Sequence, residues 1–218
     1  IWEHLIWFAL PLLVGNIFQI LYNTVDSIVV GNFVGKQALA AVGGSGPIIN
    51  TLIGIFNGLS SGATVVVSQN YGAHDNKRVS EAVHSTIALT AVLSVIFTIV
   101  GMLGTPLMLR MMAVPEDVMP EALTYLRIYF AGVSGLLFYN MGSGILRAVG
   151  DSRRPTLFLV FSAITNIVLD LVFVLVFSMG AAGVAYATII SQFLSAILVM
   201  ITLMRSDGAY RFVLKKIK

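Results

Sequence analysis

The chain has 218 residues, of which 57% are hydrophobic and 11% are charged, with a net charge of +3 and no cysteine. A soluble domain carries about 25% charged residues, so the mean hydropathy of +0.92 and several long apolar runs exclude an ordinary soluble domain and place the chain in the membrane class. The lack of cysteine excludes disulfides and thiolate metal sites, and basic loops at one membrane surface explain the positive charge without a nucleic-acid partner.

Six apolar segments are each long enough to cross a bilayer, which requires about 20 helical residues. Gly and Pro occur in nearly all the connections between them, as expected at helix ends, and the run Gly43–Pro47 is expected to be a turn that opens the second helix. We therefore predict an all-α membrane protein, with residues 1–204 forming one six-helix bundle and residues 205–218 a basic amphipathic cytoplasmic tail or linker. The predicted helices lie at about 5–31, 45–68, 83–104, 121–146, 156–177 and 183–204.

Basic residues determine the predicted orientation. Two of them, Lys36 and Arg110, fall on the side opposite the N-terminus, whereas ten fall on its own side. Because cytoplasmic loops carry the excess of Lys and Arg, we expect both ends of the chain to be cytoplasmic in a multi-pass protein of a prokaryotic plasma membrane. The ten residues are Lys77, Arg78, Arg147, Arg153, Arg154, Arg205, Arg211, Lys215, Lys216 and Lys218.

Polar side chains recur on one face of the first helix, where Asn16, Gln19, Asn23 and Asp26 are spaced by three, four and three residues. Similar stripes follow the second and sixth helices. Lipid does not tolerate so many unpaired polar groups, so the stripes predict a hydrated or hydrogen-bonded interior, although single Ser and Thr residues are also explained by packing between helices. The candidates for lining this cavity are Asn16, Gln19, Asn23, Asn57, Tyr139, Asn140 and Gln192.

Two carboxylates fall within the predicted membrane helices. Asp170 has Asn166 one helical turn before it, and Asp26 lies towards the outer end of the first helix. A membrane carboxylate is energetically expensive and marks a functional site; it is neutralised either by a proton or by a cation that neutral oxygens help to hold. With Thr188, these residues form the predicted cation- or proton-coupling site, in which Asp26 and Asp170 are metal ligands only if the ion is Na⁺. The alternative for Asp26 is that it reaches the outer interface.

The three histidines, His4, His74 and His84, are scattered without the spacing of metal ligands. We expect them to be solvated or interfacial. Pro11 lies inside the first predicted helix, where a proline frees a carbonyl and permits a kink.

Several short stretches are informative because of their order on six helices. They are Pro11 followed by Asn23-Thr24-Val25-Asp26 and Val30-Gly31, then Ser68-Gln69-Asn70-Tyr71-Gly72-Ala73, Leu146-Arg147-Ala148-Val149-Gly150-Asp151, Asn166 to Asp170, and Thr188. In this order the chain resembles, over essentially its whole length, the amino-terminal half of a multidrug and toxic compound extrusion (MATE) transporter.

The resemblance implies a twelve-helix antiporter of two six-helix lobes around a central cavity. Such a protein exports cationic or amphipathic drugs and toxic compounds in exchange for inward Na⁺ or H⁺ and needs no other cofactor. The resemblance assigns ion coupling to Asp26, Asn166, Asp170 and Thr188, and it matches Pro11 to a proline proposed to bend the first helix. The expected partners are the small substrate, membrane lipid, and a missing carboxy-terminal lobe or a second copy.

Three alternatives remain at this point. A flippase for lipid-linked sugars has a similar helix layout, but it needs several Arg or Lys residues for a diphosphate. A half-length fragment would be inactive alone. An intramembrane aspartyl protease also needs two membrane carboxylates, but its Gly-X-Gly-Asp is missing because Ala148-Val149 precedes Gly150-Asp151. We therefore do not expect an enzyme.

Overall fold

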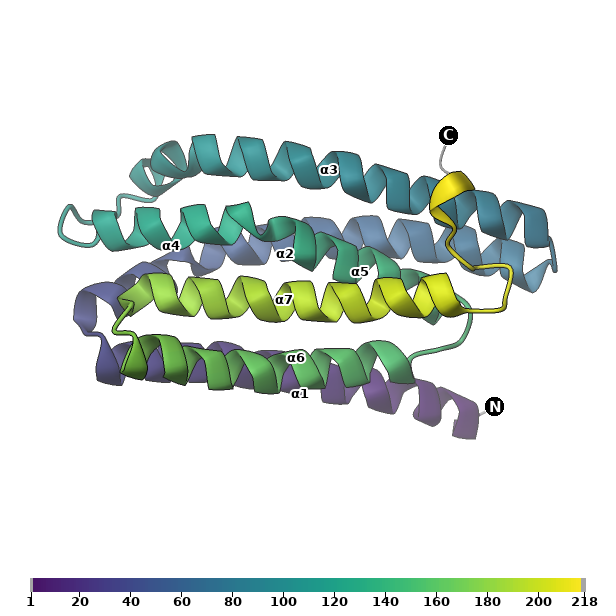
Figure 1. Ribbon diagram of the computed structural model, residues 1–218, viewed down its shortest axis with the longest axis horizontal. Coiled ribbons are helices and arrows are strands. Elements are labelled where there is room, and N and C mark those ends of the chain that lie inside the picture. The colour runs from purple at the N-terminus through teal and green to yellow at the C-terminus, as the bar shows by residue number, and fades with distance from the viewer. Residues whose placement is uncertain (1, 217–218) are drawn as a thin grey trace.

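The computed structural model describes residues 2–216, and among these it describes all side chains except those of residues 2–9, 11, 12, 16, 19, 23 and 216. Long helices lie side by side in a single bundle, and both ends of the chain lie at the same end of it, together with the α2–α3 and α5–α6 connections (Figure 1). The elements are α1 (Trp2–Phe33), α2 (Lys36–Gly72), α3 (Asn76–Met111), α4 (Met119–Ala131), α5 (Val133–Ala148), α6 (Arg153–Leu171), a π-helical turn (Val172–Val176), α7 (Gly180–Arg205) and a 3₁₀ turn (Leu214–Lys216).

The number of membrane crossings agrees with the sequence. Within the described residues, five helices are long and apolar enough to span a bilayer, and α4 and α5 together make a sixth span that is bent by 45°. This confirms the predicted all-α membrane bundle. The basic loops gather at the end of the bundle that holds both chain ends, whereas Lys36 and Arg110 belong to helix ends at the opposite side (Figure 1).

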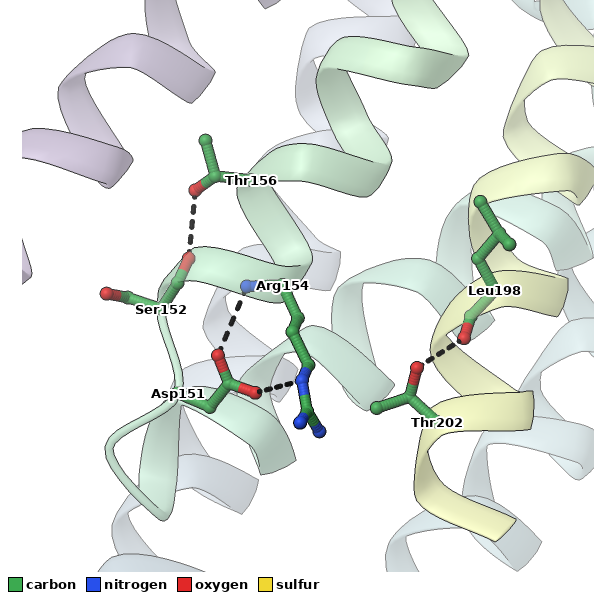
Figure 2. A network of polar contacts seen from close by, with 6 residues as sticks. All are labelled: Asp151, Ser152, Arg154, Thr156, Leu198 and Thr202. Carbon is green, nitrogen blue, oxygen red and sulfur yellow. Dashed lines mark hydrogen bonds and ion pairs between the residues drawn. The ribbon is translucent and has the colours of Figure 1, made fainter. Parts of the chain in front are cut away.

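Two helices begin at that basic end with an aspartate that bonds the backbone three residues later; Asp75 is the N-cap of α3, and Asp151 lies one residue before the N-cap of α6. Asp75 accepts a hydrogen bond from the Arg78 backbone N–H at 3.0 Å, and Asp151 accepts one from the Arg154 backbone N–H at 3.1 Å. In each pair the arginine Nε lies 3.4 Å from the second carboxylate oxygen, as Figure 2 shows for Asp151. These carboxylates satisfy backbone donors that the first helical turn leaves free.

The prediction that Gly43–Pro47 forms a turn is wrong, because these residues lie inside α2. Pro47 has no backbone N–H to donate, a loss that membrane helices tolerate. On either side of it, Ser45 donates to the Ala41 carbonyl at 2.6 Å and Thr51 to the Pro47 carbonyl at 2.8 Å. Because α2 begins at Lys36, it starts about two and a half turns before the predicted residue 45.

The predicted single helix at 121–146 is interrupted at Gly132, between α4 and α5. A Cβ built at Gly132 would lie 2.4 Å from the Cβ of Ile189 on α7, so only glycine permits this approach. The predicted helix at 156–177 also differs, since its last turn from Val172 to Val176 is π-helical. Both irregular turns lie within apolar spans, and the periodicity of apolar residues does not indicate where a helix is interrupted or becomes π-helical.

The segment after α7 folds back onto the bundle instead of leaving it. Phe212 is buried and its ring lies 5.3 Å from the imidazole of His84 on α3. The Val213 backbone N–H donates to His84 Nε2 at 3.1 Å, while His84 Nδ1 lies 2.7 Å from the Ser80 carbonyl oxygen. The expectation that His84 is solvated is therefore wrong, because the side chain is buried, with Nε2 bonded to the tail and Nδ1 next to a carbonyl of its own helix.

Candidate functional site

Two carboxyl groups meet in the interior between α1, α6 and α7. Asp170 is 0% exposed and Asp26 is 4% exposed. The Asp26 carboxyl lies close enough to the Asp170 carboxyl and to the Thr188 hydroxyl to interact with both. Asp26 therefore does not reach the outer interface, and the three residues come from three different helices.

The helices position these groups by their packing. α1 packs along α6, and α6 along α7, so residues on the facing sides of the three helices converge. Asp170 lies in the last turn of α6, directly before the π-helical turn; π-helical turns of this kind often occur at functional sites. Asn166, one turn earlier on α6, is 1% exposed. The structure thus brings together Asp26, Asn166, Asp170 and Thr188.

Most of the polar atoms in this group have no partner among the described residues. Asp26 Oδ1, both carboxyl oxygens of Asp170 and both amide atoms of Asn166 are buried without a hydrogen bond. Thr188 donates its hydroxyl hydrogen to the Val184 carbonyl at 2.9 Å, so its own oxygen remains available as an acceptor. The site is rich in oxygen acceptors and poor in donors, and this composition suits a cation or a proton.

A transition-metal site does not fit this composition. Among the described residues, no three His, Asp or Glu side chains come together as a metal cluster. A hard cation with oxygen ligands remains compatible, since it accepts carboxylate, amide and hydroxyl oxygens together.

A cavity of about 60 Å³ lies one helical turn from the carboxyl groups, on the side towards the end of the bundle that carries both chain ends. Asn57, Tyr139, Asn140 and Gln192 line it, as does Asn166, whereas Asp26, Asp170 and Thr188 do not. The remaining lining residues are Tyr22, Ile53, Leu136, Leu159, Ser162, Ala163, Ser191 and Ser195.

The side chains of Pro11, Asn16, Gln19 and Asn23 lie outside the residues whose side chains are described. The kink predicted at Pro11 and the contribution of the three polar residues to the cavity therefore stay predictions.

Sequence reasoning missed three tyrosines. Tyr22 lines the cavity, and Tyr125 and Tyr129 are buried on α4. All three tyrosines are close enough to Asp26 to interact with its charge. Tyr22 precedes Asp26 by four residues, so the helical repeat placed it on the same face. The two tyrosines of α4 carry no comparable signal, because their apolar bodies fit an ordinary buried face.

The comparisons with known proteins agree on one family. The sequence model described as MatE matches residues 11–172. The probable multidrug resistance proteins YpnP and YoeA of Bacillus subtilis are 37% identical over 190 residues and 32% identical over 216 residues. These alignments cover 87% and 97% of the chain but 43% and 47% of the relatives.

The solved structures extend this likeness to three dimensions. A crystal structure of a MATE protein in the bent conformation superposes with a TM-score of 0.92 at 29% identity, over 99% of the chain and 48% of that protein. The chain thus spans about half the length of the proteins that it matches.

Proposed function

The chain belongs to the MatE family of multidrug and toxic compound extrusion (MATE) transporters, and from this premise we propose that it is the amino-terminal lobe of a cation-coupled antiporter. The family is non-enzymatic, which sets aside the protease alternative. In the proposed reaction the site at Asp26 and Asp170 takes up Na⁺ or H⁺, and the complete protein uses this uptake to export cationic or amphipathic compounds. The proposal rests on one observation: two buried carboxyl groups on neighbouring helices lie close enough to interact.

Two carboxyl groups in contact are stable in only a few states. If both are charged in a low-dielectric interior, they repel one another and lose hydration. One of them must bind a proton, or a cation must lie between them. Neither of the ion pairs found among the described residues, at 75–78 and at 151–154, involves Asp26 or Asp170. A mobile charge is therefore the simplest partner for this pair.

The neighbouring groups support either ion. The Asn166 amide and the Thr188 hydroxyl supply neutral oxygens for Na⁺, and the same two groups accept or donate hydrogen bonds to a protonated carboxyl. We propose Asp26, Asn166, Asp170 and Thr188 as the coupling site. Coupling follows if the neutralised and charged forms favour different conformations, because a ligand shifts an equilibrium only by its difference in affinity between two states.

The cavity supports a cationic or amphipathic substrate. Tyrosine faces and amide oxygens attract cations. Lining residues such as Leu136 and Leu159 would contact the apolar part of an amphipathic substrate. Among the described lining residues none is Arg or Lys, which argues against a flippase for diphosphate-linked sugars. A drug-sized molecule needs a pocket of about 300 Å³ or more, so the second half of the protein or another conformation must supply most of the space.

The partner and orientation follow from the same reasoning. We propose that a carboxy-terminal lobe or a second copy of this chain completes the cavity. We also propose that the end of the bundle carrying both chain ends and the basic loops faces the cytoplasm of a prokaryotic cell, since Lys and Arg accumulate there.

The test is Asp170→Asn in the complete protein, reconstituted in vesicles. Efflux of a cationic dye is measured while a Na⁺ gradient and a pH gradient are imposed separately. We expect ion-driven efflux to disappear, because Asn cannot be neutralised by a cation or release a proton. Asp151→Asn, which removes a carboxylate at the capping turn and leaves a cap acceptor, is the matched control and should transport normally. Near-normal coupling by the Asp170→Asn protein would refute the proposal.

A further inference from the structure

The polar side chains of α1, α6 and α7 are stacked in layers. Asp26, Asp170 and Thr188 form the outer layer; a residue four positions away on each helix, Tyr22, Asn166 and Gln192, forms the next layer towards the cytoplasmic end. A spacing of four residues corresponds to about one helical turn, or about 5.4 Å. The two layers are therefore separated by one turn on all three helices. We call the second set the middle layer.

The cavity reaches the middle layer and stops there. All three of its residues line the cavity, whereas none of the outer three does. The outer three are at most 4% exposed in this chain alone, so any further part of the protein can only enclose them more. An ion that enters the cavity must pass the middle layer to reach the carboxyl groups.

The middle layer is also where polar groups lack partners. Both amide atoms of Gln192 and of Asn166 are buried without a hydrogen bond in the described structure, and so is the hydroxyl of Tyr129. Gln192 is 8% exposed and lies beside the hydroxyls of Tyr22 and Tyr129. Buried amides are normally paired, and an unpaired one calls for water or an ion as its partner. The cavity has room for about four waters.

We propose that the coupling ion passes between the cavity and the carboxyl pair through the middle layer, and that Gln192 sets the rate of this passage. The inference rests on the proposed function. Na⁺ would exchange a water for the Gln192 amide oxygen before it reaches the carboxylates. A proton would arrive as hydronium, leave its water in the cavity and end on a carboxyl oxygen. In both cases the amide stabilises positive charge where the surroundings are apolar.

The test compares Gln192→Leu with Gln192→Glu in the complete protein. Leucine removes the oxygen at similar volume, so we expect the maximal rate of ion-driven efflux to fall by about tenfold or more. The ion concentration that gives half the maximal rate should stay within about twofold, because slower passage lowers the binding rate and the release rate of the ion by the same factor. Glutamate keeps an oxygen at the same reach and should retain most of the rate.

Thr202→Val on the same helix is the matched control. Its hydroxyl already donates to the Leu198 carbonyl at 2.8 Å (Figure 2). Neither residue lines the cavity, so this variant should transport normally. An unchanged maximal rate in Gln192→Leu would overturn the inference. A shift in the half-saturating ion concentration at an unchanged maximal rate would also overturn it, since Gln192 would then be an ion ligand.

Two further variants keep the outcomes separate. If Asp170→Asn still couples, the proposed function fails and this inference fails with it; if only Gln192→Leu is normal, the inference alone fails. Should Gln192→Leu not fold, Tyr22→Phe removes the neighbouring hydroxyl and keeps the ring. It should slow ion-driven efflux severalfold, and a normal rate in that variant would overturn the proposal.

Discussion

The two sides of the bundle bury polar groups in different ways. On the side formed by α1, α6 and α7, carboxyl and amide groups face one another without hydrogen-bond partners. On the side formed by α2, α3 and α4, an apolar groove of about 430 Å³ lies between residues such as Ile48, Phe97 and Phe130. Three buried hydroxyls of α3 are satisfied within their own helix, since Thr90, Ser94 and Thr105 each donate to the carbonyl four residues earlier at 2.7 Å.

The difference shows that polarity alone does not mark a site in a membrane helix. Thr90 is as fully buried as Asp170, at 0% exposed, but its hydrogen bond leaves nothing for a ligand to complete. A carbonyl of the same helix can accept from an amide N–H but can pair neither an amide oxygen nor a carboxylate, so these groups keep at least one polar atom that needs a partner from elsewhere. Unpaired polarity, and not polarity itself, therefore separates the candidate site from the structural side.

The largest expected effect comes from Asp26→Asn in the complete protein. Asn at this position carries no charge for a coupling ion to neutralise, so ion-driven dye efflux should fall by about a hundredfold or more. Thr90→Val is the matched change on the other side, where a buried hydroxyl that binds only its own helix is replaced by a methyl of similar size. It should leave efflux unchanged. An equal loss of efflux in the two variants would contradict the difference between the polar side and the apolar side.

Sequence patterns were sufficient to locate the membrane spans and to identify the two membrane carboxylates. Hydropathy located six crossings, and the spacing of four residues between Asn166 and Asp170 placed them on one face of α6. Apolar length could not locate Gly132 as a break, because the break depends on the approach of Ile189 from a distant helix. Long-range contacts of this kind leave no local periodicity.

The layers were only partly visible in the sequence. Gln192 was included as a polar residue on the sixth helix, but its position one layer below the carboxyl groups depends on how α7 packs against α6. His84 was misjudged for a similar reason, since its partners are the Phe212 ring and the Val213 backbone, 128 and 129 residues away along the chain. Neither pairing follows from spacing within one helix.

A smaller effect should come from Gly101→Ala on the apolar side. A Cβ at Gly101 would lie 1.9 Å from the ring of Phe130, so the groove must rearrange, and we expect the free energy of unfolding to fall by about 2 kcal/mol. Gly58→Ala on α2 has nothing within 4 Å of its added Cβ and should be neutral or stabilising. Thermal unfolding in detergent measures both. A loss of coupling without a loss of stability in Gly101→Ala would give the apolar side a role in transport.

The smallest effect concerns the caps, which the two sides share. Asp75→Ala removes the cap of α3 on the apolar side, and Asp151→Ala removes that of α6 on the polar side, next to the turn shown in Figure 2. The two caps have almost the same geometry, so each variant should lower the free energy of unfolding by about 1 kcal/mol, as thermal unfolding would measure. Asp75→Asn and Asp151→Asn retain an acceptor and should lose less. A markedly larger effect at Asp151 would mean that the polar side depends on its helix ends more than the apolar side does, because unpaired groups in its interior leave α6 less tightly held by packing.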